Sequence, residues 1–241
     1  MTRNPARALT CAFAIAIVMQ TYVTVVGDAP AAAQDSSASR QERLFPVTDL
    51  GLLESPDRAA WQQPDLIMDK LNIAEGDTVA DIGAGSGFFT VRLARRVGPD
   101  GIVYAEDIQQ PMLESIKRRV SRERLLNSRR GVRFAEVITR LGTDTDAKLP
   151  KGALDAVLVV DVYQEVEAAD GRVSFLRHLA DALKPTGRIG IVNYKPGDAG
   201  PGPEPHRRLD RAVVEAEVAA AGLRVVDRAT LPFQYMLVVG R

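Results

Sequence analysis

Residues 78–97 constrain the fold more than any other part of the chain. An apolar, β-branched run from Thr78 to Ile82 leads into a glycine-rich turn, and a segment with helical periodicity follows from Phe88 to Val97. The turn carries alternate glycines: Gly83, Gly85 and Gly87. Glycine lets the backbone turn sharply and lets a ligand approach more closely than a Cβ atom would permit. The stretch therefore predicts a strand, a ligand-binding turn and a helix, in that order.

The alternation of strand and helix continues along the chain. Further β-branched runs and helical patterns lie at 102–106, 111–124, 132–137, 154–160, 173–183 and 188–192, with a turn expected at 184–187. Such alternation is typical of a parallel sheet covered by helices on both faces. Near the C-terminus, a helical pattern over 209–223 precedes two runs, 224–229 and 233–240, that are joined by only three residues. So short a connection permits only an antiparallel pair. The sequence predicts an α/β doubly wound sheet that ends in an antiparallel hairpin.

Three details distinguish the glycine turn from a dinucleotide-binding fingerprint. Phe88 occupies the position at which that fingerprint needs its third glycine, so a pyrophosphate would meet a bulky side chain. Asp81 stands two residues before the first glycine, where a carboxylate repels phosphates but accepts a hydrogen bond from an ammonium group. Asp107 follows about 20 residues after the turn, at the end of the next strand, where an acidic side chain binds both ribose hydroxyls.

At these residues the chain resembles the class I S-adenosylmethionine-dependent methyltransferases, from about Trp61 to the C-terminus. Their first motif, an acidic residue followed by G-x-G-x-G, is matched by Asp81 and the three glycines. Their second motif, an acidic residue that closes the second strand and an apolar residue after it, is matched by Asp107 and Ile108. The resemblance implies a Rossmann-like seven-stranded sheet and S-adenosyl-L-methionine as the cofactor, with Asp107 on the ribose and Ile108 against the adenine. A Rossmann domain that binds another nucleotide is the alternative.

The family's third and fourth motifs are matched less closely. Two residues are candidates for the third motif, an Asp near the adenine amino group: Asp144, which we prefer, and Asp146. The fourth motif falls on residues 161–165, where the strand 154–160 ends and where ligands of such sheets bind. Similar sequences often carry His at position 164, and Gln164 rules out a histidine base there. Asp161 is expected to contact the cofactor, and three residues are candidate catalytic groups: Asp161, Tyr163 and Glu165.

Together these motifs predict an enzyme that transfers a methyl group from S-adenosylmethionine to a small-molecule, lipid or protein acceptor. A non-catalytic protein that binds S-adenosylmethionine or a nucleoside with the same fold is the alternative. Methyl transfer needs no metal, because the sulfonium carbon is already activated. The only cysteine, Cys11, lies in the N-terminal apolar run, which excludes a thiolate nucleophile from the mature chain. Trp61, the only tryptophan, either packs a helix onto the sheet or lines a substrate pocket.

Charge gives no reason to expect a nucleic-acid partner. The 31 Lys and Arg residues balance the 31 Asp and Glu residues. One basic run stands out in the sequence: Lys117, Arg118, Arg119, Arg122, Arg124, Arg129, Arg130 and Arg133. No aromatic residues interleave with it, so we expect a solvated face.

The N-terminus has the composition of an export signal. Arg3 and Arg7 precede an uncharged run from Ala8 to Gly27, and the small residues 31–33 fit a signal-peptidase site. We expect a signal peptide over 1–33, a linker over 34–43 and a methyltransferase domain over 44–241, located in the periplasm or outside the cell. With the signal peptide removed, no membrane span is expected. An uncleaved membrane anchor is the alternative, because the apolar run is about 18 residues long. The same motifs resemble a subgroup of exported bacterial methyltransferases.

Overall fold

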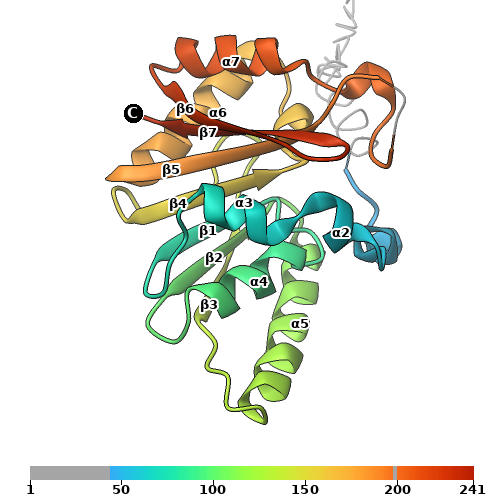
Figure 1. Cartoon of the computed structure of the whole chain (residues 1–241), viewed down its shortest axis with the longest axis vertical. Coiled ribbons are helices and arrows are strands. Elements are labelled where there is room, and N and C mark those ends of the chain that lie inside the picture. Colours follow the sequence, from blue (N-terminus) through green and yellow to red (C-terminus); the bar gives the residue numbers. More distant parts are fainter. Residues whose placement is uncertain (1–43, 198–199) are drawn as a thin grey trace, which may run out of the picture. The chain divides into compact units, whose positions relative to one another are not determined.

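One mixed sheet organises the chain (Figure 1). Its strands are β1 (Thr78–Ile82), β2 (Ile102–Asp107), β3 (Glu136–Leu141), β4 (Leu154–Val160), β5 (Leu183–Tyr194), β6 (Arg224–Thr230) and β7 (Gln234–Gly240). They lie in the order β3-β2-β1-β4-β5-β7-β6, and β7 is antiparallel to both of its neighbours. The sheet is seen in a computed structural model that describes residues 44–197 and 200–241, of which Phe45–Arg241 form one compact unit. The expected signal peptide and linker lie outside the described residues.

Helices cover both faces of this sheet. They are η1 (Val47–Glu54), α2 (Arg58–Gln62), α3 (Pro64–Lys70), α4 (Phe88–Arg96), α5 (Gln110–Ser128), η2 (Tyr163–Glu165), α6 (Ala169–Ala182), η3 (Pro205–Arg207) and α7 (Arg211–Ala220), where η marks a 3₁₀ helix. In Figure 1, α6 and α7 lie on one side of the sheet and α3 and α4 on the other. Each side has its own apolar core, one around Leu176 and Val214, the other around Ile67 and Leu93. Within the described ranges, no helix is both long and apolar enough to cross a membrane.

The sequence prediction of the fold is confirmed. β1 and β4 have the expected bounds, and the two C-terminal strands form the expected antiparallel hairpin. The Leu231 amide donates to the Gln234 carbonyl at 2.9 Å and closes the tight connection between β6 and β7. The seven strands and the antiparallel hairpin are those that the resemblance implies.

The third strand differs from the prediction, because it begins at Glu136 rather than at Val132. The residues before it hydrogen-bond to helices instead of to a strand. The Val132 amide donates to Asn127 near the end of α5, and the Ala135 amide donates to Ala94 of α4. Their apolar side chains gave the strand-like pattern, but their backbone partners lie elsewhere.

The turn expected at 184–187 is also placed differently, since it forms a bulge within β5. Leu183 pairs with Leu154 of β4, and the next pair joins Arg188 to Ala156. Three extra residues on β5 are therefore accommodated while the two strands remain paired on either side. Lys184 within the bulge makes an ion pair with Asp155 at 2.6 Å.

The parallel strands bring distant parts of the sequence to one edge of the sheet. β1, β2 and β4 end at Ile82, Asp107 and Val160, and Ile82 is aligned with Glu106 on one side and Val159 on the other. The loops that follow these strands are therefore neighbours, as expected for ligand sites at the carboxyl ends of parallel strands.

Candidate functional site

The glycine turn after β1 needs glycine for conformation and for space. Gly83, Gly85 and Gly87 have φ values of +61°, +52° and +79°, in the left-handed region that residues with a Cβ atom disfavour. A Cβ atom on Gly83 would lie 2.2 Å from the Cγ2 atom of Val162, which follows β4. The turn therefore packs directly against the loop after β4, with no room for a side chain between them.

Asp107 is fixed beside this turn. Its carboxylate accepts hydrogen bonds from the Gly85 amide at 3.0 Å and the Gln109 amide at 2.9 Å. The side chain is 6% exposed, and burial raises the pKa of the Asp107 carboxyl while the amide donors oppose that shift. Ile108 follows it and is partly exposed at the same edge. The two residues of the second motif thus stand where the resemblance expects them.

Asp81 lies in β1, two residues before the turn, and hydrogen-bonds to the first turn of α4. Its carboxylate accepts a hydrogen bond from the Thr90 hydroxyl at 2.6 Å, and it is 3% exposed. Burial raises the pKa of Asp81 to about 6, although Thr90 and the charge of Arg58 act in the opposite direction. One carboxylate oxygen therefore anchors α4 in this structure.

Glu106 is a site residue that sequence reasoning missed. It is 3% exposed and accepts a hydrogen bond from the Gly83 amide at 3.3 Å, while its Oε1 atom is buried without a hydrogen-bond partner among the described residues. A Cβ atom on Gly142 would come within 1.8 Å of that Oε1 atom, so Gly142 makes room for it. Burial raises the pKa of Glu106 to about 8, and Asp107 and Asp81 add to the shift. A second acidic residue before Asp107 was the only signal in the sequence.

Asp161 directly follows β4 and belongs to an amide clamp, which we define as Asp161 with Gln62 and Gln234. Gln234 donates to its Oδ1 atom at 2.6 Å, and Gln62 donates to its Oδ2 atom at 3.2 Å. Both glutamines are fully buried, and Gln62 also donates to Gln234 at 3.2 Å. Asp161 itself is partly buried and has a φ of +60°. Burial raises the pKa of Asp161 to about 7, opposed chiefly by Arg58.

Arg58 connects the amide clamp to the glycine turn. Its Nε atom donates to Gln62 at 2.7 Å, and its guanidinium lies 4.1 Å from the centroid of the Phe88 ring. Its charge acts on both Asp81 and Asp161. This arginine precedes the motifs that the sequence analysis used, and no pattern in the sequence marked it.

Three aromatic side chains lie next to the amide clamp. The ring of Trp61 is 6.2 Å from that of Tyr194 and 6.0 Å from that of Phe233, between centroids. We call these three residues the aromatic group. Gly200 and Gly202 pack against it, since a Cβ atom on them would lie 2.3 Å from Phe233 and 2.6 Å from Tyr194. Trp61 thus packs its helix onto the end of β5, and it is itself partly exposed.

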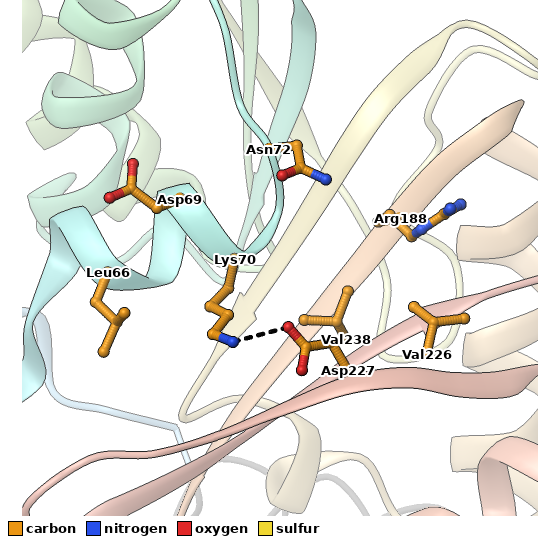
Figure 2. A pocket seen from close by; sticks show the side chains of 8 residues that line it. All are labelled: Leu66, Asp69, Lys70, Asn72, Arg188, Val226, Asp227 and Val238. Atoms are coloured by element: carbon orange, nitrogen blue, oxygen red, sulfur yellow. Dashed lines mark hydrogen bonds and ion pairs between the residues drawn. The ribbon is translucent and has the colours of Figure 1, made fainter.

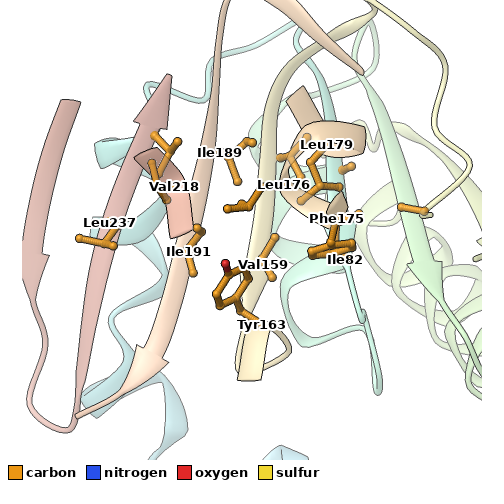
Figure 3. Close-up of a cluster of buried hydrophobic side chains, with 14 of the residues drawn as sticks. Ile82, Val159, Tyr163, Phe175, Leu176, Leu179, Ile189, Ile191, Val218 and Leu237 are labelled. Carbon is orange, nitrogen blue, oxygen red and sulfur yellow. The ribbon is translucent and has the colours of Figure 1, made fainter. Parts of the chain in front are cut away.

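Tyr163 does not lie at the open edge that the sequence analysis expected. It is fully buried in the core under α6 and α7, as Figure 3 shows, and its hydroxyl donates to Glu217 at 2.8 Å. Arg172 of α6 forms an ion pair with the same carboxylate at 2.6 Å. The sequence placed this ring correctly after β4 but did not show which way it turns. Glu165 makes an ion pair with Arg207 of η3.

The candidates for the third motif lie in the loop after β3. Asp144 is exposed, whereas Asp146 is partly buried and accepts a hydrogen bond from the Lys148 amide at 2.8 Å. The Thr143 amide donates to the Asp146 carbonyl at 2.8 Å, which closes a tight turn. The loop follows Gly142, and the Gly142 amide donates to the Asp107 carbonyl at 3.2 Å.

The segment before α2 lies across the glycine turn. The Leu53 side chain lies over Gly85, where an added Cβ atom would be 3.3 Å from it. Glu54 accepts hydrogen bonds from the Ser86 hydroxyl and from Arg119. Gln109, just after the second motif, donates to the Phe45 carbonyl at 3.2 Å. Residues 45–54 therefore cover the turn and the end of β2.

One surface hollow lies elsewhere on the sheet. It measures about 490 Å³ and is lined by residues of α3, β5, β6 and β7, among them Asn72, Arg188 and Val226 (Figure 2). Lys70 and Asp227 make an ion pair of 2.9 Å within it. None of the site residues expected from the sequence lines this groove, so we do not assign the reaction to it.

Comparisons with known proteins point to methyltransferases. Residues 79–187 match the family described as Methyltransferase domain. Nocamycin O-methyltransferase of Saccharothrix syringae is 30% identical over 59% of this chain and 44% of that protein. The ubiquinone/menaquinone biosynthesis C-methyltransferase UbiE of Burkholderia mallei is 32% identical over 66% of this chain and 57% of that protein. The chain spans about half the length of these curated relatives.

Solved structures show the same fold. A SAM-dependent methyltransferase from Aquifex aeolicus has a TM-score of 0.70 at 23% identity, covering 81% of this chain and 98% of that one. Magnesium protoporphyrin IX methyltransferase from Synechocystis, solved with bound SAM, has a TM-score of 0.55 at 16% identity, covering 86% and 91%. By sequence, residues 79–187 match a methyltransferase domain, and the fold is that of SAM-dependent methyltransferases of known structure.

The residues present fit this cofactor. The glycine turn leaves a surface without side chains, next to an acidic residue whose carboxylate is fixed by amide donors. Asp81 and Asp107 make this region unfavourable for phosphates and favourable for a ligand that carries ribose hydroxyls and a positive charge. The donor set is therefore that of a nucleoside site with a cationic end rather than of a pyrophosphate site.

Proposed function

We propose that the protein transfers a methyl group from S-adenosylmethionine to a small-molecule, lipid or protein acceptor, with a small molecule favoured. The observation that carries this proposal is the left-handed glycine turn beside Asp107, whose carboxylate the Gly85 and Gln109 amides hold in place. When bound, the cofactor supplies an electrophilic methyl group, already activated by the sulfonium charge. The chain then has to hold, align and dehydrate the reactants.

The named residues divide this work. Asp107 accepts hydrogen bonds from both ribose hydroxyls, and Ile108 packs against the adenine ring. The glycine turn lets the ligand approach the backbone, and the covering segment 45–54 excludes water. Asp144 or Asp146 accepts a hydrogen bond from the adenine amino group. Removing each of these side chains tests its role, because the affinity for the cofactor should then fall.

Asp161 is the group best placed to take a proton from the acceptor. It follows β4, next to Val162, which packs on the glycine turn, and burial raises its pKa to about 7, so at neutral pH it alternates between acid and base forms. Tyr163 is not part of this proposal, because its hydroxyl lies in the core on Glu217. Glu165 is less suited than Asp161, since it is paired with Arg207.

The aromatic group favours an acceptor with a flat ring. Trp61, Tyr194 and Phe233 meet beside the amide clamp, and aromatic rings pack well on planar apolar ligands. Two of the relatives are named for O-methylation and for C-methylation in quinone biosynthesis, which are reactions of small molecules. A phenol or a quinone-like ring is therefore the class of acceptor to try first.

Calorimetry on the full chain tests the cofactor, and isotope transfer tests the reaction. We expect S-adenosylmethionine and S-adenosylhomocysteine to bind and NAD not to bind. Tritium from labelled S-adenosylmethionine should then enter a phenolic or quinone fraction of a cell extract. Binding of both nucleosides without methyl transfer to any fraction would favour the non-catalytic alternative, and binding of NAD alone would refute the proposal.

We also propose that the N-terminus exports the domain. The support is in the sequence alone: two arginines, an uncharged run and three alanines at 31–33. A fusion of residues 1–40 to a reporter enzyme that works only after export should be active, and the mature protein should begin near Gln34. Recovery of the intact N-terminus from the cytosol would contradict export.

A further inference from the structure

The outward face of α5 is basic, and the proposed reaction does not use it. The helix and the turn that follows it carry four arginines and two leucines, all exposed: Arg118, Arg122, Leu125, Leu126, Arg129 and Arg130. We call this set the α5 basic face. Leu125 and Leu126 are 55% and 45% exposed and lie next to each other in the last turns of the helix.

The spacing of these residues places them together. Positions 118, 122 and 125 follow the i, i+4, i+7 pattern of one helical stripe, and Leu126 lies one residue further round. Arg129 and Arg130 follow directly in the turn that ends the helix. The buried residues of α5, such as Ile116 and Val120, lie on the opposite side and pack towards the sheet. The two leucines therefore point away from the core, among arginines.

The charge of this face is not neutralised within the described residues. Arg122, Arg129 and Arg130 make no ion pair there, while the acidic residues of α5 are engaged. Glu123 pairs with Arg95, and Glu114 pairs with Lys117. In a chain with no net charge, the face is a local excess of positive charge.

A hollow continues the face at the C-terminal end of α5. It measures about 330 Å³, and its lining includes Arg124, Ser128, Val132 and Arg133. Val132 is 43% exposed. Guanidinium and hydroxyl groups are donors that bind phosphate oxygens, and Val132 adds apolar surface beside them.

We propose that the α5 basic face docks the protein on a bilayer that contains anionic phospholipids. The arginines contact headgroup phosphates, and Leu125 and Leu126 enter the interface, as in other basic amphipathic helices that lie on membranes. Nucleic acid would use the arginines but not the leucines, and no aromatic side chain of the face is available for base stacking. Arg119, next to the face in sequence, contacts Ser86 of the glycine turn, so docking would bring the cofactor site near the lipid surface.

Vesicle binding of the full chain tests the proposal. Vesicles of phosphatidylcholine with phosphatidylglycerol should bind the protein more tightly than phosphatidylcholine alone, with an affinity that falls as salt rises. The double variant Arg122→Gln/Arg129→Gln should bind the anionic vesicles about thirtyfold more weakly. The control Lys151→Gln/Arg224→Gln removes the same charge from exposed positions outside α5 and should stay within about twofold. The N-terminal segment is the same in all variants, so it does not affect the differences between their vesicle affinities.

The leucines separate a membrane from a nucleic acid. Leu125→Gln/Leu126→Gln should weaken vesicle binding about tenfold and leave binding to duplex DNA unchanged. Equal binding of the parent and the double arginine variant to anionic vesicles would overturn the proposal. The proposal would also be overturned if the leucine variant bound vesicles as tightly as the parent and duplex DNA displaced the protein from them. That result would indicate a nucleic-acid surface instead.

Discussion

The cofactor side and the acceptor side of the site are built in different ways. On the cofactor side, the glycine turn binds Glu106 and Asp107 through contacts that span only 23 and 22 positions of sequence. On the acceptor side, the amide clamp joins Asp161 to Gln62, which is 99 positions away, and it joins Gln62 to Gln234 across 172 positions. The first side is a local supersecondary unit, whereas the second exists only when the whole sheet has assembled. The two sides should therefore respond differently to substitution.

The largest effect is expected at Glu217, which supports the acceptor side from the core. Glu217→Ala leaves the Arg172 charge and the Tyr163 hydroxyl buried without their partner. The free energy of unfolding should fall by about 3–5 kcal/mol, the usual cost of removing one member of a buried pair. Urea unfolding measures it. Glu215→Ala, on the exposed side of the same helix, is the control and should leave the unfolding midpoint nearly unchanged. Similar midpoints for the two variants would show that the buried network does not hold this side together.

The next largest effect is expected on the turnover rate when Asp161 is replaced. If its carboxylate accepts the acceptor's proton, the rate should rise with pH and level off above about 7, where the group has lost its proton. Asp161→Asn should lower the rate about a hundredfold and flatten the pH profile, with S-adenosylhomocysteine affinity changed far less. Glu167→Gln, exposed in the same loop, should keep the parent profile. An Asn variant with an unchanged profile would remove Asp161 from the proton transfer.

On the cofactor side, Glu106 makes stability depend on pH. Its folded pKa of about 8 lies above the ordinary value of 4.5, so the folded state holds the proton more tightly. The stability from this group is complete below the unfolded pKa and is lost as pH rises through the folded one. Between pH 6 and 8.5 the free energy of unfolding of the parent should fall by about 2 kcal/mol more than that of Glu106→Gln, because the glutamine cannot ionise. Unfolding at both pH values measures this, and Glu136→Gln on exposed β3 should follow the parent. Parallel curves for the parent and Glu106→Gln would mean that Glu106 does not titrate in this range.

The last effect is expected at Asp107, and it should be confined to the cofactor side. Asp107→Ala removes the acceptor of two ribose hydrogen bonds, each worth roughly 1.5–3 kcal/mol. Calorimetry should show S-adenosylhomocysteine affinity reduced by at least about tenfold, with the fold retained. Arg118→Ala, on the exposed face of α5, should stay within about twofold. A folded Asp107→Ala protein that binds as tightly as the parent would refute the ribose assignment.

The sequence predicts the cofactor side better than the acceptor side, because the contacts of the cofactor side are closer together in sequence. Gly83, Gly85, Gly87 and Asp107 were predicted as cofactor residues from their spacing and Ile108 from the family resemblance, because a strand, a turn and a helix in succession fix their mutual positions. The direction of Tyr163 could not be predicted, since the residue after a strand can turn to either face and only its packing on Glu217 decides which. Glu106 and Arg58 were missed because a single acidic or basic residue has no pattern, and their roles depend on burial and on distant partners.

The sequence by itself determined the order of strands and helices, the antiparallel hairpin at the end and the glycine turn with its acidic partner. These features follow from periodicity, short connections and the conformational freedom of glycine, which act over a few residues. The tertiary structure decided what surrounds Asp161, which residues are buried beside it and which way Tyr163 faces. Those outcomes depend on burial and on hydrogen bonds between residues far apart in sequence, because desolvation and packing are set only when the strands have come together.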